Sequence, residues 1–518
     1  MRGSDADPAG DRLRRDLFTT YGRKGRFQVT GSLLIAGTTS DAGKSVVTTG
    51  LCRAFARRGL HVAPYKAQNM SNNSMVTTEG SEIGRAQWVQ AVAARAEPES
   101  AMNPVLLKPG SDLRSHVVVR GRPAGHLEAG EFAGGRAPLA EAAFAAYDDL
   151  AGRFDVVVCE GAGSPAEVNL RAHDYVNMGL ARHGGIPTLL VGDIDRGGVF
   201  AAMHGTLALL EAADQALMAG FVVNKFRGDV GLLRPGLDTL ERITGRPVLG
   251  VLPWLPGLWL DSEDALALRD RAAAPSPLVD RTRVAVVVLP RISNFTDLDA
   301  LCLEPGLDVV FADSPRALSG ADVVVLPGTR STVADLAWLR ERGLADAVVA
   351  HARHGGVVLG ICGGFQMLGR TVADPHGVEG RPGTEVDGLG LLDVRTEFAA
   401  EKVLRLPTGT ALGVEAAGYE IHHGRVTVGD DEPFLGGARS GAVFGTMWHG
   451  SLEGDGLRRA WLREVGAVPD DAVSFPRARD ARIEALADAV EEHLDVDAVL
   501  DLVTLGVPSY PVVRGGLA

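Results

Sequence analysis

The stretch LLIAGTTSDAGKSVVTTGL, residues 33–51, joins an apolar strand to a helix through a loop of small and polar residues. Its Gly43-Lys44-Ser45 ending is typical of a P-loop, in which backbone N–H groups cradle phosphates. The lysine of such a loop reaches the β and γ oxygens of ATP, and the serine hydroxyl holds Mg²⁺. Because five residues rather than four separate Gly37 from Gly43, the motif is no strict Walker A and indicates a longer-looped branch. We therefore expect ATP and Mg²⁺ at the start of this helix.

Apolar strands recur along the first half of the chain, and each ends in glycine or a polar residue. Their sequences are HVAPYK, DVVVCEG, IPTLLVGD and AGFVVNKF. Their alternation with helical stretches predicts a parallel α/β sheet. Since ligands bind at the carboxyl ends of the strands in such sheets, the predicted site includes Lys66, Glu160, Asp193 and Asn224.

These strand-end side chains suit different parts of an ATP site. Glu160 is expected to hold Mg²⁺ together with Ser45, because Mg²⁺ usually takes one or two carboxylates with phosphates and water. Lys66 would neutralise a transferring phosphoryl group, and Asn224 would read the base. Asp193 is a second magnesium candidate, and a helix N-cap is an equally weighted interpretation of this residue.

The segment KAQNMSNNS, residues 66–74, is dense in amides and hydroxyls and is a poor core sequence. At the ligand edge of the sheet, this composition favours recognition of a substrate rich in carboxylates and amides. A solvated loop is the other interpretation.

In the second half, VVLGICGGFQMLG (357–369) places Cys362 between an apolar strand and a helix-like segment. A helix N-terminus points backbone N–H groups at the thiol and lowers its pKa from about 8.5 into a range of roughly 3.5–7.5. Cys362 is therefore a candidate nucleophile, with a small buried core cysteine as the other interpretation. A nucleophile also needs a base within hydrogen-bonding reach and an oxyanion hole.

Two further motifs supply these groups. VFGTMWHGSLEG places His449 at a strand end, and VVVLPGTRST places Gly328 in a turn. The N–H groups of Gly328 and Gly363 would form the oxyanion hole. His422 and His423, in GYEIHHGR, are rivals for the base, with a polar turn or a structural contact as the other interpretation.

The 518 residues are too many for one hydrophobic core, so two or more domains are expected. The strand–helix alternation breaks near residue 270, where charged residues, alanines and prolines indicate a domain seam. The amphipathic pattern of the C-terminal helix is expected to pack on the second domain. The predicted parts are a disordered leader (1–28), an ATP-binding domain (29–262), a linker (263–282) and a second α/β domain with the C-terminal helix (283–518).

The composition excludes several function classes. The formal net charge of −13 argues against nucleic-acid binding, which depends on clustered Lys and Arg. No apolar run is long enough to cross a membrane, and the N-terminal stretch lacks the apolar core of a signal peptide. The four cysteines lie far apart without a CxxC pair, so neither a disulfide framework nor a zinc site is indicated. We expect a cytoplasmic protein.

Taken together, these motifs resemble a known family. GICGGFQ and GTMWHG are similar to class I glutamine amidotransferases of the cobyrinic and cobyric acid synthase type. GTTSDAGKS with EGAGSPAEVN is similar to the dethiobiotin-synthetase-like ATPases. Their order, with KAQNMSNNS, EIGRAQ, MNPVLLKP, DIDRGGVF, NKFRGD and GYEIHHG, resembles the cobyric acid synthase family of cobalamin biosynthesis. The resemblance implies a P-loop parallel-sheet domain followed by a class I amidotransferase α/β domain.

The resemblance carries roles onto the matching residues. Cys362 matches the nucleophile of the family, and His449 matches its general base. The oxyanion, phosphate and metal positions match Gly328, Gly363, Lys44, Ser45 and Glu160. Many amidotransferases carry a glutamate two residues after the histidine, where this chain has Ser451. The chain therefore resembles the branch that works with a Cys–His dyad, and another group must orient His449.

The resemblance also implies the reaction. ATP and glutamine would drive amidation of the b, d, e and g carboxylates of adenosylcobyrinic acid a,c-diamide to give adenosylcobyric acid. Cys362 would release ammonia from glutamine, and the ATP site would activate each carboxylate as an acyl phosphate. An enclosed path between the domains would protect the ammonia from protonation. The expected partners are glutamine, ATP and the corrinoid, whose cobalt is part of the substrate, and the oligomeric state is left open.

Three alternatives stay open. The nearest is the sister reaction, amidation of the a and c carboxylates of cobyrinic acid, although KAQNMSNNS and DIDRGGVF favour the first interpretation. An ATP-driven switch of the partitioning type shares the P-loop architecture, but it gives no reason for a thiol and a histidine on a second domain. A degenerate amidotransferase domain used only for binding is disfavoured by the presence of both Cys362 and His449.

Overall fold

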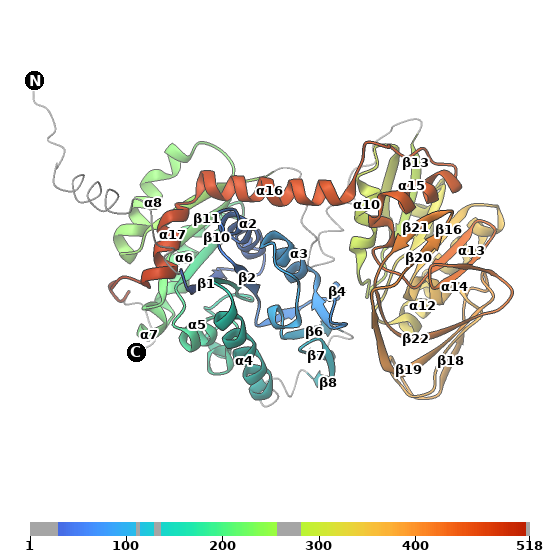
Figure 1. The fold of residues 1–518 in the computed structure, drawn as a ribbon, viewed down its shortest axis with the longest axis horizontal. Helices are drawn as coiled ribbons and strands as arrows, with labels where there is room; N and C mark the ends of the chain where they lie inside the picture. Colours follow the sequence, from blue (N-terminus) through green and yellow to red (C-terminus); the bar gives the residue numbers. More distant parts are fainter. Residues whose placement is uncertain (1–28, 110–113, 129–135, 256–280, 514–518) are drawn as a thin grey trace, which may run out of the picture.

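The computed structural model describes residues 29–109, 114–128, 136–255 and 281–513. Two α/β domains, residues 29–255 and 281–474, are followed by a helical segment that reaches from the second domain back to the first (Figure 1). The predicted fold class, a parallel-sheet domain followed by a second α/β domain, is confirmed. The predicted leader and nearly all of the predicted linker lie outside the described residues. No helix among the described residues is long and apolar enough to cross a bilayer.

The first domain is built on a six-stranded sheet in the order β12-β11-β10-β1-β9-β2, in which all neighbouring strands are parallel. In β1, Leu33 and Ile35 face one apolar core, whereas Leu34 and Ala36 face another. Burial on both faces explains why these strands read as continuous apolar runs. The strands are β1 (Gly31–Gly37), β2 (Val62–Tyr65), β9 (Val156–Glu160), β10 (Thr188–Asp193), β11 (Met218–Phe226) and β12 (Val248–Pro253). The helices are α2 (Lys44–Arg57), α3 (Arg85–Ala93), α4 (Ala137–Arg153), α5 (Met178–Gly184), α6 (Val199–Ala208), α7 (Ala212–Gln215) and α8 (Val230–Thr244).

The polar segment 66–74 contributes to two small sheets that lie between the main sheet and the second domain (Figure 1). Most of its amide and hydroxyl side chains are buried, whereas Met70 is exposed. The interpretation of this segment as a solvated loop is therefore wrong. One small sheet has the order β3-β6-β7-β8, and the other pairs β4 with β5. Their strands are β3 (Gln68–Met70), β4 (Ser74–Val76), β5 (Glu82–Gly84), β6 (Val105–Pro109), β7 (Arg114–Val119) and β8 (Arg122–Glu128).

The second domain is built on a seven-stranded sheet in the order β14-β13-β15-β16-β25-β24-β23. The strands from β14 to β25 are parallel, and β24 and β23 add an antiparallel hairpin at one edge. The strands are β13 (Thr282–Val287), β14 (Leu307–Ala312), β15 (Val323–Leu326), β16 (Val357–Ile361), β23 (Glu432–Phe434), β24 (Gly437–Ser440) and β25 (Val443–Thr446). The helices are α10 (Asp299–Cys302), α11 (Pro315–Leu318), α12 (Thr332–Glu341), α13 (Leu344–Arg353), α14 (Gly363–Leu368) and α15 (Asp455–Glu464).

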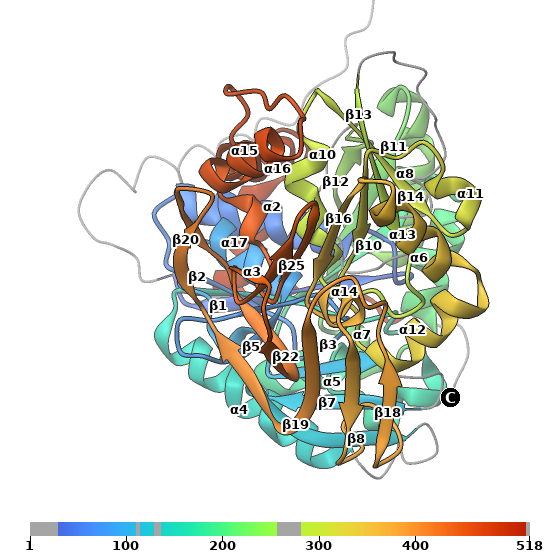
Figure 2. The same cartoon turned by 90° about the vertical axis from the view of Figure 1, so that its right-hand side faces the viewer.

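A second, mostly antiparallel sheet follows α14 and extends this domain beyond what the apolar pattern predicted. Its order is β18-β17-β19-β22, and β20 and β21 form a separate hairpin. Figure 2 shows β19 and β22 on the side that faces the viewer when the second domain is in front. The strands are β17 (Thr371–Asp374), β18 (Thr384–Asp387), β19 (Val394–Arg405), β20 (Thr408–Ala411), β21 (Val414–Ala417) and β22 (Glu420–Val428).

The C-terminal helices pack on the first domain, so the prediction that they pack on the second domain is wrong. Helix α16 (Phe475–His493) begins beside α15 and then lies along α2, while α17 (Val496–Leu505) packs against β1 (Figure 1). A Cβ atom on Gly50 of α2 would lie 2.5 Å from Val490 Cγ2, so α2 and α16 approach closely at this glycine. The helical periodicity predicted these helices, but it carries no information about which surface their apolar face covers.

Candidate active site

The candidate nucleophile Cys362 lies between β16 and α14, where the chain turns sharply. Its backbone has φ 50° and ψ −108°, a conformation that non-glycine residues rarely adopt and that functional turns can hold. The turn needs the following glycines, because a Cβ atom on Gly364 would lie 2.0 Å from the carbonyl oxygen of Leu326. Cys362 borders the apolar core and also lines a cavity, so its position suits a nucleophile rather than a purely structural cysteine.

His449 follows β25, which pairs with β16, and this pairing brings the imidazole beside Cys362. Its Nδ1 atom lies 2.7 Å from Oδ2 of Asp297, and Oδ1 of Asp297 accepts the N–H of Gly450 at 2.7 Å. The side chains of His449 and Asp297 are both buried. The carboxylate therefore fixes the ring on one side, and the thiol of Cys362 contacts it on the other.

The electrostatics of this array favour a charged histidine. Burial lowers the pKa of His449, but the negative charge of Asp297, and after it Cys362, raises this pKa to about 10. An imidazolium next to a thiol stabilises the thiolate, which is the nucleophilic form of cysteine. The three side chains are thus arranged for nucleophilic catalysis by sulfur.

Asp297 was not among the predicted residues. It lies in the 3₁₀ turn η5 (Phe295–Leu298), 152 residues before His449 in the chain. No motif spacing marks it, and only the fold brings it to the histidine. The sequence predicted that a group other than Ser451 orients His449 but did not identify it, and in the structure the carboxylate of Asp297 contacts the ring.

The two predicted oxyanion glycines lie where no side chain fits. A Cβ atom on Gly328 would lie 2.8 Å from Cε1 of His449, and one on Gly363 would lie 2.6 Å from Cγ2 of Thr329. Gly363 is the first residue of α14, so its N–H has no acceptor within the helix. This close packing suits an oxyanion hole, and the role of the two N–H groups stays a prediction.

The rival histidines, His422 and His423, lie on β22 and line the same cavity as Cys362. Their Nδ1 atoms lie 2.8 Å from the carbonyl oxygen of Gly424 and 3.1 Å from that of Ala399, respectively. Burial, together with nearby cations, lowers the pKa of His423 to about 4. These contacts favour a structural role for the pair, although in a strand rather than in a polar turn.

In the first domain, polar side chains converge on Glu160 at the end of β9. Its Oε1 atom accepts hydrogen bonds from Ser45 Oγ and Lys66 Nζ, each at 2.9 Å, and Oε2 accepts one from Gln90 Nε2 at 2.6 Å. Burial raises the pKa of Glu160, but Lys66, Gln90 and Lys44 outweigh this effect and hold it below its usual value. The structure thus brings together Ser45, Lys66 and Glu160 as predicted, and it adds Gln90 of α3, which no motif had indicated.

The phosphate loop is held by its own lysine and by Asn224. Asn224 Nδ2 donates to the carbonyl oxygen of Ala42 at 2.9 Å. Gly43 has φ 98°, and a Cβ atom there would lie 1.9 Å from this Nδ2 atom, so the position requires glycine. Asn224 therefore positions the loop, and its recognition of the base stays a prediction. Lys44 Nζ donates at 2.9–3.2 Å to the carbonyl oxygens of Thr39, Ser40 and Gly163.

Asp193 lies at the end of β10, as predicted, but its described contacts are with Lys225 and Asp195 and not with the residues around Glu160. Its Oδ2 atom pairs with Lys225 Nζ at 2.7 Å, and its Oδ1 atom accepts the N–H of Asp195 at 2.9 Å. The next helix, α6, begins only at Val199, so the interpretation of Asp193 as a helix N-cap is wrong. A magnesium role for Asp193 stays a prediction.

Buried polar contacts join the two domains beside the thiol site. Glu82 of β5 accepts Lys108 Nζ at 2.6 Å and also pairs with Lys402 of β19. The N–H of Ser74 donates to Asn294 Oδ1 at 2.9 Å, just before the turn that carries Asp297.

A second contact reaches the turn that follows His449. Arg85 at the start of α3 pairs with Glu453 at 2.7 Å, and Glu453 also pairs with Arg479 of α16 at 2.6 Å. The first domain thus contacts two segments near His449. One contains Asn294, just before the turn that carries Asp297, and the other contains Glu453, just after the histidine.

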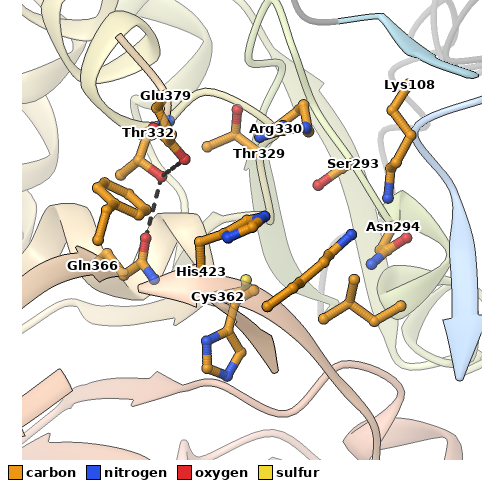
Figure 3. A pocket seen from close by; sticks show the side chains of 14 residues that line it. Lys108, Ser293, Asn294, Thr329, Arg330, Thr332, Cys362, Gln366, Glu379 and His423 are labelled. Carbon is orange, nitrogen blue, oxygen red and sulfur yellow. Dashed lines mark hydrogen bonds between the residues drawn. The ribbon is translucent and has the colours of Figure 1, made fainter. Parts of the chain in front are cut away.

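The cavity beside Cys362 opens toward this interface (Figure 3). Lys108 of the first domain lines it together with residues of the second domain. Figure 3 shows Thr332 and Glu379 at one end, Lys108 and Asn294 at the other, and Cys362 between them. The cavity therefore connects the thiol with a side chain of the domain that carries the phosphate loop.

Comparisons with known proteins agree with this architecture. Residues 33–266 match the CobQ/CobB/MinD/ParA nucleotide binding domain, and residues 283–457 match the CobB/CobQ-like glutamine amidotransferase domain. Three relatives named cobyric acid synthase are highly similar. They are from Mycolicibacterium vanbaalenii (69% identical, covering 91% of this chain and 96% of the relative), Mycolicibacterium gilvum (67%, covering 92% and 97%) and Mycobacterium ulcerans (66%, covering 93% and 99%).

Both domain families match in the predicted order, and the similarity spans nearly the whole chain. The chain therefore belongs to the cobyric acid synthase family, carbon–nitrogen ligases of cobalamin biosynthesis that carry a glutamine amidotransferase domain.

Proposed function

We propose that this chain amidates the b, d, e and g carboxylates of adenosylcobyrinic acid a,c-diamide, with glutamine as the nitrogen donor and ATP as the activating substrate. The observation that carries this proposal is the buried array of Cys362, His449 and Asp297, on a domain joined by buried ion pairs to the phosphate loop domain. The names of the relatives support the corrinoid substrate.

The second domain would release ammonia. The thiolate of Cys362 attacks the carboxamide carbon of glutamine, and the N–H groups of Gly328 and Gly363 stabilise the oxyanion. Each such donor typically contributes about 2.7–4 kcal/mol to transition-state stabilisation. His449 gives its proton to the leaving ammonia and then takes one from the water that hydrolyses the thioester. Asp297 keeps the imidazole oriented through both transfers.

The first domain would activate the carboxylate. Lys44 and Lys66 neutralise charge while the γ-phosphoryl group moves to a corrinoid carboxylate. Ammonia then attacks the carbonyl carbon of the acyl phosphate, which forms the amide and releases phosphate. Ser45 Oγ and Glu160 Oε1 lie 2.9 Å apart and are oxygen ligands that fit Mg²⁺. Bound there, Mg²⁺ would neutralise charge on the phosphate oxygens.

Ammonia has to travel from Cys362 to the acyl phosphate without being protonated. The cavity between Cys362 and Lys108 supports the predicted enclosed path, because it leads from the thiol to the domain interface. The buried contacts of Glu82 with Lys108 and Lys402 lie at this end of the cavity.

Mass spectrometry of the corrinoid after incubation with the protein, ATP, Mg²⁺ and glutamine tests the proposal. We expect stepwise conversion of adenosylcobyrinic acid a,c-diamide by four acid-to-amide changes. An untouched corrinoid with continuing glutamine hydrolysis would contradict the assigned substrate. Cobyrinic acid would then be tried as the substrate of the sister reaction.

A further inference from the structure

Arg330 is a cation in the cavity beside Cys362 that the mechanism above does not use. It follows Thr329, whose side chain packs against Gly363 in the turn after the nucleophile. Within residues 29–109, 114–128, 136–255 and 281–513, no hydrogen bond or ion pair joins its guanidinium group to another side chain or carbonyl, and it feels Glu379 and Glu82 only as nearby charges. Burial lowers the pKa of Arg330, and the negative charges of Glu379 and Glu82 oppose this effect. A partly buried cation that lines a cavity and has no hydrogen-bonded partner favours an anionic ligand.

The other cations of this cavity are already paired. Lys108 and Lys402 both bind Glu82, from opposite sides of the domain interface. Because Glu82 forms ion pairs with both lysines, Arg330 is the cation of the cavity that is available to bind a ligand's negative charge.

The cavity also contains a carboxylate, Glu379, at the end opposite to Lys108 (Figure 3). Glu379 accepts the N–H groups of Thr332 and Val333 at 2.7 and 3.4 Å, so it already occupies the N-terminus of α12. These two N–H groups are therefore not free for a ligand carboxylate, whereas the guanidinium group of Arg330 is. Burial raises the pKa of Glu379 to about 7, and a ligand cation would stabilise its ionised form.

Arg330 and Glu379 thus present one positive and one negative group around the nucleophile. An α-amino acid in its zwitterionic form carries the complementary pair of charges. In glutamine, two methylene groups separate this pair from the amide carbon that the thiolate attacks. A cavity that contains the thiol, the cation and the anion together matches the three parts of that molecule.

We propose that Arg330 binds the α-carboxylate of the amino acid whose side-chain amide Cys362 attacks, and that Glu379 binds its α-ammonium group. This inference rests on the proposed use of glutamine at Cys362, but it does not depend on the identity of the corrinoid. The two residues would make the site specific for free glutamine over simple primary amides and over glutamine within a peptide chain.

The test removes the charges from the protein and from the substrate in turn. The variants are Arg330→Met and Glu379→Gln, with Arg340→Met as a matched control, because Arg340 is an exposed cation of the same domain. The substrates are L-glutamine, 4-aminobutanamide, which lacks the α-carboxylate, and glutaramate, which lacks the α-ammonium group. Ammonia release is measured with the full chain in the presence of ATP, Mg²⁺ and the corrinoid.

We expect Arg330→Met to lower kcat/KM for L-glutamine about 10- to 100-fold, as is typical for loss of a hydrogen bond to a charged group. With 4-aminobutanamide the variant and the wild type should be equal, since the group that Arg330 binds is missing. Glu379→Gln should lose activity on L-glutamine but match the wild type on glutaramate. Arg340→Met should behave like the wild type on all three substrates.

Two outcomes would overturn the inference. Equal losses of the Arg330 variant on all three substrates would show that the residue only supports the fold. A raised KM for the corrinoid in ammonium-driven amidation, with glutamine hydrolysis unchanged, would assign the cation to a corrinoid carboxylate instead. If the wild type failed to amidate the corrinoid but kept the expected substrate pattern, the proposed substrate would fall and this inference would stand.

Discussion

The thiol site and the phosphate-loop site each contain a buried carboxylate, but the two carboxylates are partnered in opposite ways. Asp297 binds one imidazole and one backbone N–H, and it raises the pKa of His449. Glu160 accepts hydrogen bonds from a lysine, a serine and a glutamine, and its donors and nearby cations hold its own pKa below the usual value.

The first arrangement tunes a base, whereas the second keeps a carboxylate ionised by surrounding it with donors. Loss of a partner should therefore affect mainly catalysis at the thiol site, but both catalysis and stability at the phosphate-loop site.

The largest effect is expected from Cys362→Ser. Glutamine-dependent amidation should fall to background, because a serine at this position lacks the acidity that makes a thiol an effective nucleophile. Amidation supplied with ammonium should persist, since the first domain is untouched. Mass spectrometry of the corrinoid with each nitrogen source measures both rates. Loss of amidation with ammonium as well would contradict the separation into two sites.

Lys44→Ala should abolish amidation with either nitrogen source, because the lysine of a P-loop is the side chain that reaches the β and γ phosphates. Some glutamine hydrolysis should survive, as the thiol site lies in the other domain. The comparison uses ammonia release and corrinoid products in parallel. Full amidation by this variant would remove Lys44 from the ATP site.

Lys66→Met should destabilise the protein by about 3–5 kcal/mol, the usual cost of leaving one member of a buried ion pair uncompensated. The pair is buried, with side-chain exposures of 5% for Lys66 and 1% for Glu160. Denaturant unfolding of the first domain measures the loss. The double variant Lys66→Met/Glu160→Gln should recover much of the stability but none of the amidation. A double variant as unstable as the single one would argue against the ion pair as the cause.

Asp297→Asn should have a smaller effect on stability and a clear effect on pH dependence. The pKa of His449 should fall from about 10. The basic limb of the pH–rate profile of glutamine hydrolysis should therefore shift to lower pH, and the rate at the optimum should drop about 10²-fold. Because the folded pKa lies above the ordinary value of 6.5, the His449–Asp297 pair contributes its full stability below about pH 6.5. That contribution is lost as the pH rises through about 10.

The control for this prediction is the unfolding free energy of the two proteins across that pH range. The difference between wild type and Asp297→Asn should shrink as the pH rises. A constant difference would mean that Asp297 acts through packing and not through the charge of the histidine.

Local sequence patterns predicted those parts of the fold that depend on neighbouring residues in the chain. The P-loop and the Cys362 turn each join a strand, a glycine turn and a helix within a few residues, so spacing alone identified them. The strand-end residues Lys66 and Glu160 were found because parallel strands bring their carboxyl ends to one edge.

Other features depend on contacts that no local pattern records. Asp297 lies in a short 3₁₀ turn far from His449 in the chain, and Gln90 reaches Glu160 from the middle of α3. The same holds for the C-terminal helices, because periodicity predicts the apolar face of a helix but not the surface on which that face packs. In the structure, the close approach of Gly50 and Val490 and the ion pair of Arg53 with Asp480 show which surface α16 covers.

The docking of α16 and α17 on the first domain has a consequence for how the protein is made. The core beside β1 includes Ile483, Val490 and Val499, which are synthesised only after the whole second domain. The core of the first domain is therefore completed only after the second domain has been made. Residues of α2 already pack on this core, but the apolar surface that α16 and α17 cover stays exposed until then. Such a face invites aggregation and chaperone capture. Release of α16 and α17 from the ribosome ends this exposure, so a chain shortened before residue 475 should accumulate as an insoluble or chaperone-bound product.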